Sequence, residues 1–115
     1  MAKILANVLL VFIFLSISMS SEAQFEDYCI ADEQCTEDVL MNAMSWACSN
    51  GADCSAIQAD QTCFLPNTTK DHASYAFNSY YQHTKHNGGT CYFSAAAVLT
   101  AANPSHDQCR FDYVP

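Results

Sequence analysis

The segment HASYAFNSYYQ, residues 72–82, combines aromatic rings and amides at spacings that could recognise a sugar. On a helix, Tyr75, Asn78 and Gln82 share one face. An aromatic ring can cover the apolar side of a pyranose, and an amide can donate to and accept from paired hydroxyls. Two interpretations remain open from this pattern: an exposed binding face, or Tyr75 packed under a loop beside two solvated amides.

The other face of this helix is predicted to be core. Ala73, Ala76, Phe77 and Tyr80 lie together at helical spacing, and Thr84 continues the stripe. Small alanines beside large rings favour close packing on another helix. We predict this helix over residues 70–85, capped by an Asn or Thr at position 67 or 68 and ended by the sequence HNGG.

A second amphipathic helix is predicted over residues 36–49. Its start carries two acids, and Asn50-Gly51 is a natural stop. Residues 51–66 have the composition of a loop, residues 90–94 that of a strand, and residues 109–113 that of a last short strand. Residues 95–105 fit either helix or strand. The expected apolar side of the first helix is formed by Val39, Leu40, Ala43, Met44 and Ala47.

The acidic and histidine side chains give no catalytic or metal-binding pattern. Glycoside hydrolysis needs two carboxylates across a cleft, but Glu37 and Asp38 begin a helix and Asp53 lies in a cysteine-bounded loop. A Cys/His nucleophile is equally unsupported in a chain whose cysteines are expected to be oxidised. No Cys-x-x-Cys pair occurs, and the four histidines are scattered. We therefore expect no enzyme, no metal and no cofactor.

The charge of the chain restricts its partners. The formal net charge is −8 at pH 7. Nucleic acids and anionic membranes attract basic surfaces, so neither is expected as a partner. Neutral and cationic ligands remain open.

The first residues have the pattern of a secretory signal peptide. A short positive start precedes an apolar run over residues 4–20, and the sequence SEA follows with small residues at the cleavage positions. The run is close to membrane-spanning length, so an uncleaved anchor is the alternative. We predict a signal peptide over residues 1–23 and one domain over residues 24–115. The expected product is secreted and carries one glycosylation sequon, at Asn67.

Seven cysteines in so small a secreted domain favour disulfides over zinc. Seven is odd, so one thiol is left over. The spacing of the cysteines does not choose the pairs.

Several motifs then reveal a resemblance to a known family. The chain contains, in this order, YCIADE, NAMSWACSNGADCSAIQ, TCFLPNTTKDHASYAFNSYYQ, CYFSAAAVLT and NPSHDQC. This series resembles the plant carbohydrate-binding module family 43. The family forms pollen-allergen domains, carboxy-terminal domains of plant β-1,3-glucanases, and plasmodesmal callose-binding proteins. The resemblance covers essentially all of residues 24–115.

The resemblance implies a small disulfide-rich α+β fold, in which two helices pack at an angle beside a short antiparallel sheet. It also implies a non-catalytic, secreted module of the plant cell wall that binds β-1,3-glucan of the callose or laminarin type. This expected ligand favours the exposed-face interpretation of Tyr75, Asn78 and Gln82. The implied disulfides join Cys29 to Cys91, Cys48 to Cys54, and Cys63 to Cys109.

Two residues depart from the family pattern. Cys35 is the surplus cysteine, either a buried free thiol or the site of a disulfide dimer. Tyr28 stands where the family usually has Trp, and its ring would either contact the ligand or fill the core. These departures leave an alternative function: a small cystine-rich wall-interaction or defence protein that has lost affinity for glucan.

Overall fold

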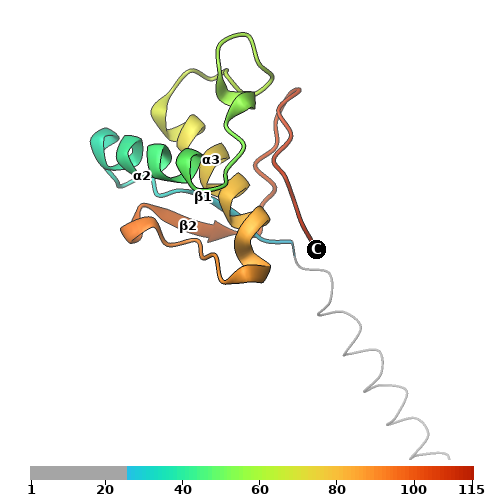
Figure 1. Ribbon diagram of the computed structural model, residues 1–115. Helices are drawn as coiled ribbons and strands as arrows, with labels where there is room; N and C mark the ends of the chain where they lie inside the picture. The colour runs from blue at the N-terminus through green and yellow to red at the C-terminus, as the bar shows by residue number, and fades with distance from the viewer. Residues whose placement is uncertain (1–25) are drawn as a thin grey trace, which may run out of the picture.

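The structure, a computed structural model, describes residues 26–115. Two helices pack beside a two-stranded antiparallel sheet, and three disulfides fasten the domain. The predicted small disulfide-rich α+β fold is therefore confirmed (Figure 1). The predicted signal peptide lies outside the described residues. Within residues 26–115, no helix has the length and apolarity needed to cross a membrane.

Helix α2 (Glu37–Ser49) begins and ends close to the predicted positions. Thr36 caps it, since its hydroxyl accepts from the backbone N–H of Val39 at 3.4 Å. The N–H of Asn50 closes the last turn on Ala47 O. Leu40 and Ala47 are buried as expected, but Val39 is exposed. The apolar stripe of this helix therefore does not lie wholly in the core.

Helix α3 (Thr69–Thr84) starts one residue earlier than predicted and is capped by Thr68. The hydroxyl of Thr68 accepts from the N–H of Asp71 at 3.1 Å. Ala73, Ala76 and Phe77 are fully buried, so the predicted core face is confirmed at these positions.

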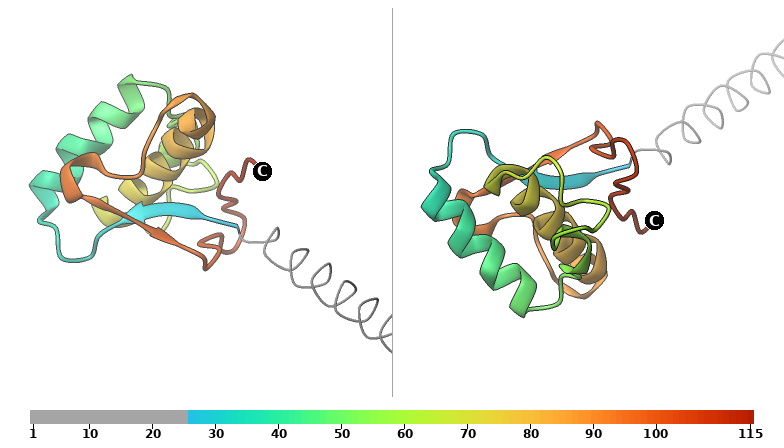
Figure 2. Two further views of the ribbon diagram at one scale, coloured as in Figure 1. Left: turned by 90° about the horizontal axis from the view of Figure 1, so that it is seen from below. Right: turned by 90° about the horizontal axis from the view of Figure 1, so that it is seen from above.

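Strands β1 (Tyr28–Ala31) and β2 (Ala97–Thr100) form the sheet. They pair antiparallel, with Tyr28 opposite Thr100 and Ala31 opposite Ala97. Figure 2 shows this sheet on one side of the helix layer. Short 3₁₀ turns complete the chain: η2 (Ser55–Ile57), η3 (Lys85–Asn87) and η4 (Phe93–Ala95).

Two predicted strands are absent from the described chain. In place of the strand over residues 90–94, the chain enters a turn in which Phe93, Ser94 and Ala95 all have positive φ. Left-handed residues cannot continue an extended strand. The segment 109–113 contributes only an isolated bridge between Cys109 and His106.

The three disulfides are those that the resemblance implies. The first spans 62 residues and ties β1 to the segment before η4, while the second closes the end of α2 over six residues. The third spans 46 residues and ties the loop before α3 to the carboxyl-terminal segment. The pairs are Cys29 with Cys91, Cys48 with Cys54, and Cys63 with Cys109.

Candidate functional site

The three residues predicted to bind ligand do not lie on an exposed face. Tyr75 is 8% exposed, Asn78 1% and Gln82 2%. The ring of Tyr75 packs edge-on against Phe111, with 5.2 Å between the ring centroids. The prediction of an exposed face is therefore wrong, because β1 and the carboxyl-terminal segment cover it.

Asn78 uses its whole amide to hold the fold. Its Oδ1 accepts from the backbone N–H of Cys29 at 3.1 Å and from Gln82 Nε2 at 3.1 Å. Its Nδ2 donates to the carbonyl of Asp112 at 2.8 Å. This amide therefore joins β1 and the carboxyl-terminal segment to α3.

Gln82 does the same one turn later. Its Nε2 also donates to the carbonyl of Asp27 at 2.7 Å, and its Oε1 accepts from the N–H of Val114 at 2.9 Å. A buried backbone group without a partner is costly, and these amides supply partners that a two-stranded sheet cannot.

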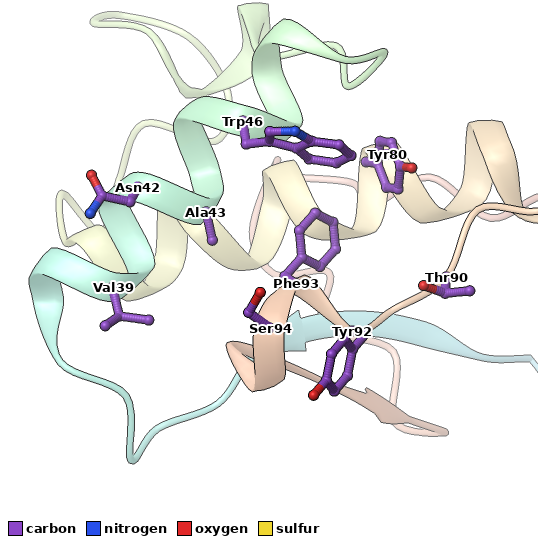
Figure 3. A pocket seen from close by; sticks show the side chains of 9 residues that line it. All are labelled: Val39, Asn42, Ala43, Trp46, Tyr80, Thr90, Tyr92, Phe93 and Ser94. Carbon is purple, nitrogen blue, oxygen red and sulfur yellow. The ribbon is translucent and has the colours of Figure 1, made fainter.

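A groove of about 500 Å³ lies elsewhere, between α2 and the segment 90–94 (Figure 3). None of the three predicted ligand residues lines it. Its lining consists of Val39, Asn42, Ala43, Trp46, Tyr80, Thr90, Tyr92, Phe93 and Ser94.

The aromatic part of the groove is anchored in the core. The Phe93 ring stacks on buried Phe77, with centroids 4.4 Å apart, and meets Tyr80 edge-on at 5.3 Å. Trp46 then packs edge-on against Tyr80 at 5.1 Å. Such ring pairs contribute about 0.5–1.5 kcal/mol each beyond burial. The rings are thus held in place before any ligand arrives.

Two aromatic side chains of the groove remain open to solvent. Trp46 is 50% exposed and Tyr92 is 64% exposed. Figure 3 shows Trp46 on the α2 side and Tyr92 on the opposite side, with Phe93 between them. Exposed rings on an anchored base can stack on an apolar ligand face.

The polar groups of the groove are available to a ligand. Asn42, Thr90 and Ser94 are exposed, and across residues 26–115 their side chains make no hydrogen bond to the protein. The same holds for the hydroxyls of Tyr80 and Tyr92. All nine lining residues are uncharged. The groove therefore offers neutral donors and acceptors beside aromatic surface.

The wall opposite α2 is built on a strained turn. Phe93, Ser94 and Ala95 have φ of 50°, 54° and 68°, a conformation that costs an L-residue about 1–2 kcal/mol. The turn is held by the neighbouring Cys29–Cys91 disulfide and by a hydrogen bond from Asp32 N to Ala96 O at 2.9 Å. Strain of this kind gathers at functional sites.

Sequence reasoning missed this groove although half of its pattern was visible. Val39, Asn42, Ala43 and Trp46 follow the i, i+3, i+4, i+7 spacing of one helix stripe. The sequence predicts Val39 and Ala43 on the apolar side of this helix and gives Asn42 no role in binding. The sequence contains no pattern that predicts the left-handed turn at residues 93–95, which forms the other wall of the groove.

The two departures from the family pattern lie outside the groove. Tyr28 is 2% exposed, with its ring 5.7 Å from that of Tyr113, so it fills the core. Burial, together with a hydrogen bond to Glu26, raises the pKa of Tyr28 to about 12. Cys35 is a half-buried free thiol, and its Sγ lies 3.5 Å from Ala95 O.

Histidines and acids do not gather into a metal site in the described part of the chain. His72, in the first turn of α3, lies with its Nε2 2.6 Å from Phe64 O.

Comparison with known proteins gives the family. The family model of the X8 domain matches residues 27–98. Glucan endo-1,3-beta-glucosidase 4 of Arabidopsis thaliana is 46% identical over 85 residues, which are 73% of this chain and 17% of that protein. Glucan endo-1,3-beta-D-glucosidase of Olea europaea is 42% identical over 84 residues, 73% of this chain and 18% of that protein. The chain thus spans less than a fifth of these relatives. It belongs to the X8 domain family, carbohydrate-binding module family 43.

Proposed function

We propose that this chain is a non-catalytic module that binds β-1,3-glucan in the groove between α2 and the segment 90–94. The relatives are named for action on glucan 1,3-β-linkages, and the part they share with this chain is the X8 domain. A glucan is neutral and rich in hydroxyls, and each pyranose has apolar C–H faces. The groove has the matching chemistry.

A contrast between two sets of amides and hydroxyls carries the proposal. The polar atoms of Asn78 and Gln82 are buried and used by the fold. Those of Asn42, Thr90 and Ser94 are exposed beside Trp46 and Tyr92 and have no partner within residues 26–115. We therefore move the proposed ligand contacts from the α3 face to the groove.

The lining of the groove supports binding without hydrolysis. Hydrolysis of a glycosidic bond needs a pair of carboxyl groups flanking it. Among residues 26–115, neither Asp nor Glu lines the groove. The proposed role is therefore to hold the glucan, not to cleave it.

The buried position of Tyr28 weakens the alternative of a wall-interaction or defence protein without glucan affinity. That alternative depended partly on a lost ligand contact at this position. A ring that is 2% exposed beside Tyr113, and that does not line the groove, is not placed to be such a contact.

Affinity electrophoresis through laminarin tests the function, with cellulose-type and starch-type glucans as controls. We expect retardation by laminarin only. Replacement of Trp46 or Tyr92 by Ala should weaken binding at least about tenfold, or about 1.4 kcal/mol. Met41→Ala is the matched control, because Met41 is an exposed apolar residue of α2 that does not line the groove. Absence of retardation, with the three disulfides verified, would favour the interaction protein.

We also propose that the domain is secreted to the plant cell wall, as three disulfides are typical of an oxidising compartment. Protein collected from the medium should begin at Gln24 and carry a glycan on exposed Asn67. A non-reducing gel would show whether Cys35 forms the disulfide dimer. An intact leader on the secreted protein would contradict cleavage after residue 23.

A further inference from the structure

We infer that the groove takes an internal segment of the glucan chain and does not recognise a chain end. This inference rests on the proposed function.

The groove is an open trough. Of its nine lining residues, Ala43, Tyr80 and Phe93 are half-buried and the other six are exposed. Figure 3 shows Val39 and Asn42 at one end, and Tyr80 and Thr90 at the other. None of the lining residues within the described part of the chain is fully buried, so none walls off an end. A polymer can therefore enter at one end and leave at the other.

A site for a chain end needs a different construction. It must bury the terminal sugar, and each hydroxyl that loses water must find a partner or cost about 1–3 kcal/mol. The half-buried base of this groove consists of Ala43, Tyr80 and Phe93, in which the Tyr80 hydroxyl is the only polar side-chain atom. Such a base can pack against the C–H faces of sugars. It does not provide hydrogen-bond partners for the several hydroxyls of a buried terminal sugar.

The polar groups are spread along the trough. Asn42 lies toward one end on the α2 side, Ser94 lies near the middle of the opposite side, and Thr90 lies toward the other end (Figure 3). Groups so dispersed suit the hydroxyls of successive sugars. Trp46 and Tyr92 provide aromatic rings on opposite sides of the trough, between these polar groups. Affinity should therefore rise with chain length until the trough is filled.

The chemistry of the 1,3-linkage supplies a decisive test. An internal 3-linked glucosyl residue has free hydroxyls at C2, C4 and C6, no two of them on adjacent carbons. Periodate cleaves adjacent diols and therefore leaves internal residues intact. The two terminal residues do carry adjacent hydroxyls and are opened. Borohydride then reduces the aldehydes, leaving a chain with destroyed ends and an unchanged interior.

The binding of treated and untreated linear β-1,3-glucan can be followed at the site itself, because Trp46 is the single tryptophan of the chain. We expect the two ligands to change its fluorescence with dissociation constants that agree within about twofold, or about 0.4 kcal/mol. Asn42→Ala should weaken both equally. Met41→Ala should leave both unchanged.

Failure of this inference can be told apart from failure of the proposed function. Loss of more than about tenfold in affinity, about 1.4 kcal/mol, on periodate treatment alone would show recognition of an end. A disaccharide that binds as tightly as the polymer would overturn the inference as well. If untreated glucan does not bind, the proposed function fails with it.

Discussion

At the residue scale, the surroundings of an amide decide its role more than its position on a helix does. Asn42 and Asn78 both lie within helices. Asn78 faces β1 and the carboxyl-terminal segment, whose backbone groups take up its donors and acceptor. Asn42 faces solvent at the rim of the groove. The same side chain thus fastens the fold in one place and is available to a ligand in the other.

Replacing these two asparagines by alanine should give opposite results. Asn78→Ala leaves the N–H of Cys29 and the carbonyl of Asp112 without their partner, at about 1–3 kcal/mol for each buried group. Its free energy of unfolding should fall by several kcal/mol, while the folded fraction binds glucan normally. Asn42→Ala should change stability by less than about 0.5 kcal/mol and weaken binding. Urea unfolding and laminarin titration measure the two effects.

The opposite result for Asn78→Ala would support the sequence-based prediction that this face of α3 binds the ligand. If Asn78→Ala kept its stability and lost glucan binding, the buried face of α3 would have to open to the ligand.

Helical periodicity could separate the faces of α3, but it could not show what covers each face. It correctly placed Phe77 inside. It also grouped Tyr75, Asn78 and Gln82, which do share a face. Their burial depends on β1, on Asp27 just before it, and on the carboxyl-terminal segment, which meet these side chains from 32 to 55 residues away in the sequence. Local spacing contains no information about such distant contacts.

At the element scale, the reliable predictions were those with local causes. Thr68, one of the two residues predicted to cap α3, does cap it, because a side-chain oxygen near the helix start accepts a free N–H. Thr36 caps α2 in the same way. The predicted strand over residues 90–94 does not form: the chain turns left-handed from Phe93, next to the disulfide at Cys91 and the hydrogen bond from Asp32 N to Ala96 O. Composition alone could not anticipate that constraint, and half of the groove depends on it.

The start of β1 is fastened to the end of α3 by a charged cluster. Asp27 accepts a hydrogen bond from the Tyr81 hydroxyl at 2.5 Å and lies 3.5 Å from Lys85 Nζ. The hydrogen bond from Tyr81, reinforced by the charge of Lys85, holds the pKa of Asp27 below its usual 3.8. The same hydrogen bond, with burial, raises the pKa of Tyr81 to about 12.

Asp27→Asn should therefore lower stability at neutral pH and lose its effect in acid. The folded carboxyl has the lower pKa, so its contribution is complete above the unfolded value of 3.8 and is lost as the pH falls through the folded value. Because the cluster is partly exposed, we expect about 1 kcal/mol or less at pH 7. Thermal unfolding from pH 7 down to pH 2 measures the convergence of the two proteins.

Exposed Asp60 provides the control, since its carboxylate has no hydrogen-bond partner within residues 26–115. Asp60→Asn should follow the wild-type curve throughout. A constant difference between wild type and Asp27→Asn at every pH would mean that the carboxylate acts through packing and not through its charge.

At the scale of the whole molecule, the disulfides should differ in what they stabilise. Closing a loop removes entropy from the unfolded chain, about 4 kcal/mol for the 62-residue separation of Cys29 and Cys91 and about 2 kcal/mol for the six-residue separation of Cys48 and Cys54. Replacing the first pair by alanine should cost more stability. It should also weaken glucan binding more, because Cys91 immediately precedes the Tyr92 wall.

Denaturant midpoints and laminarin affinity of the two double variants, measured below the unfolding transition, check both points. Equal losses of affinity would mean that the strained turn keeps its shape without the neighbouring disulfide.

The charge of the molecule should exclude ligands that the groove alone would accept. The net charge is −8, yet every residue lining the groove is neutral. Binding of a neutral glucan should therefore be unchanged between ~0.01 M and ~1 M salt, where the Debye length falls from ~30 Å to ~3 Å. A polyuronate of similar size should be repelled at low salt and bind better as salt rises, because screening removes the repulsion. Trp46 fluorescence can follow both titrations. A salt-sensitive affinity for neutral glucan would mean that a charged side chain outside the groove takes part in binding.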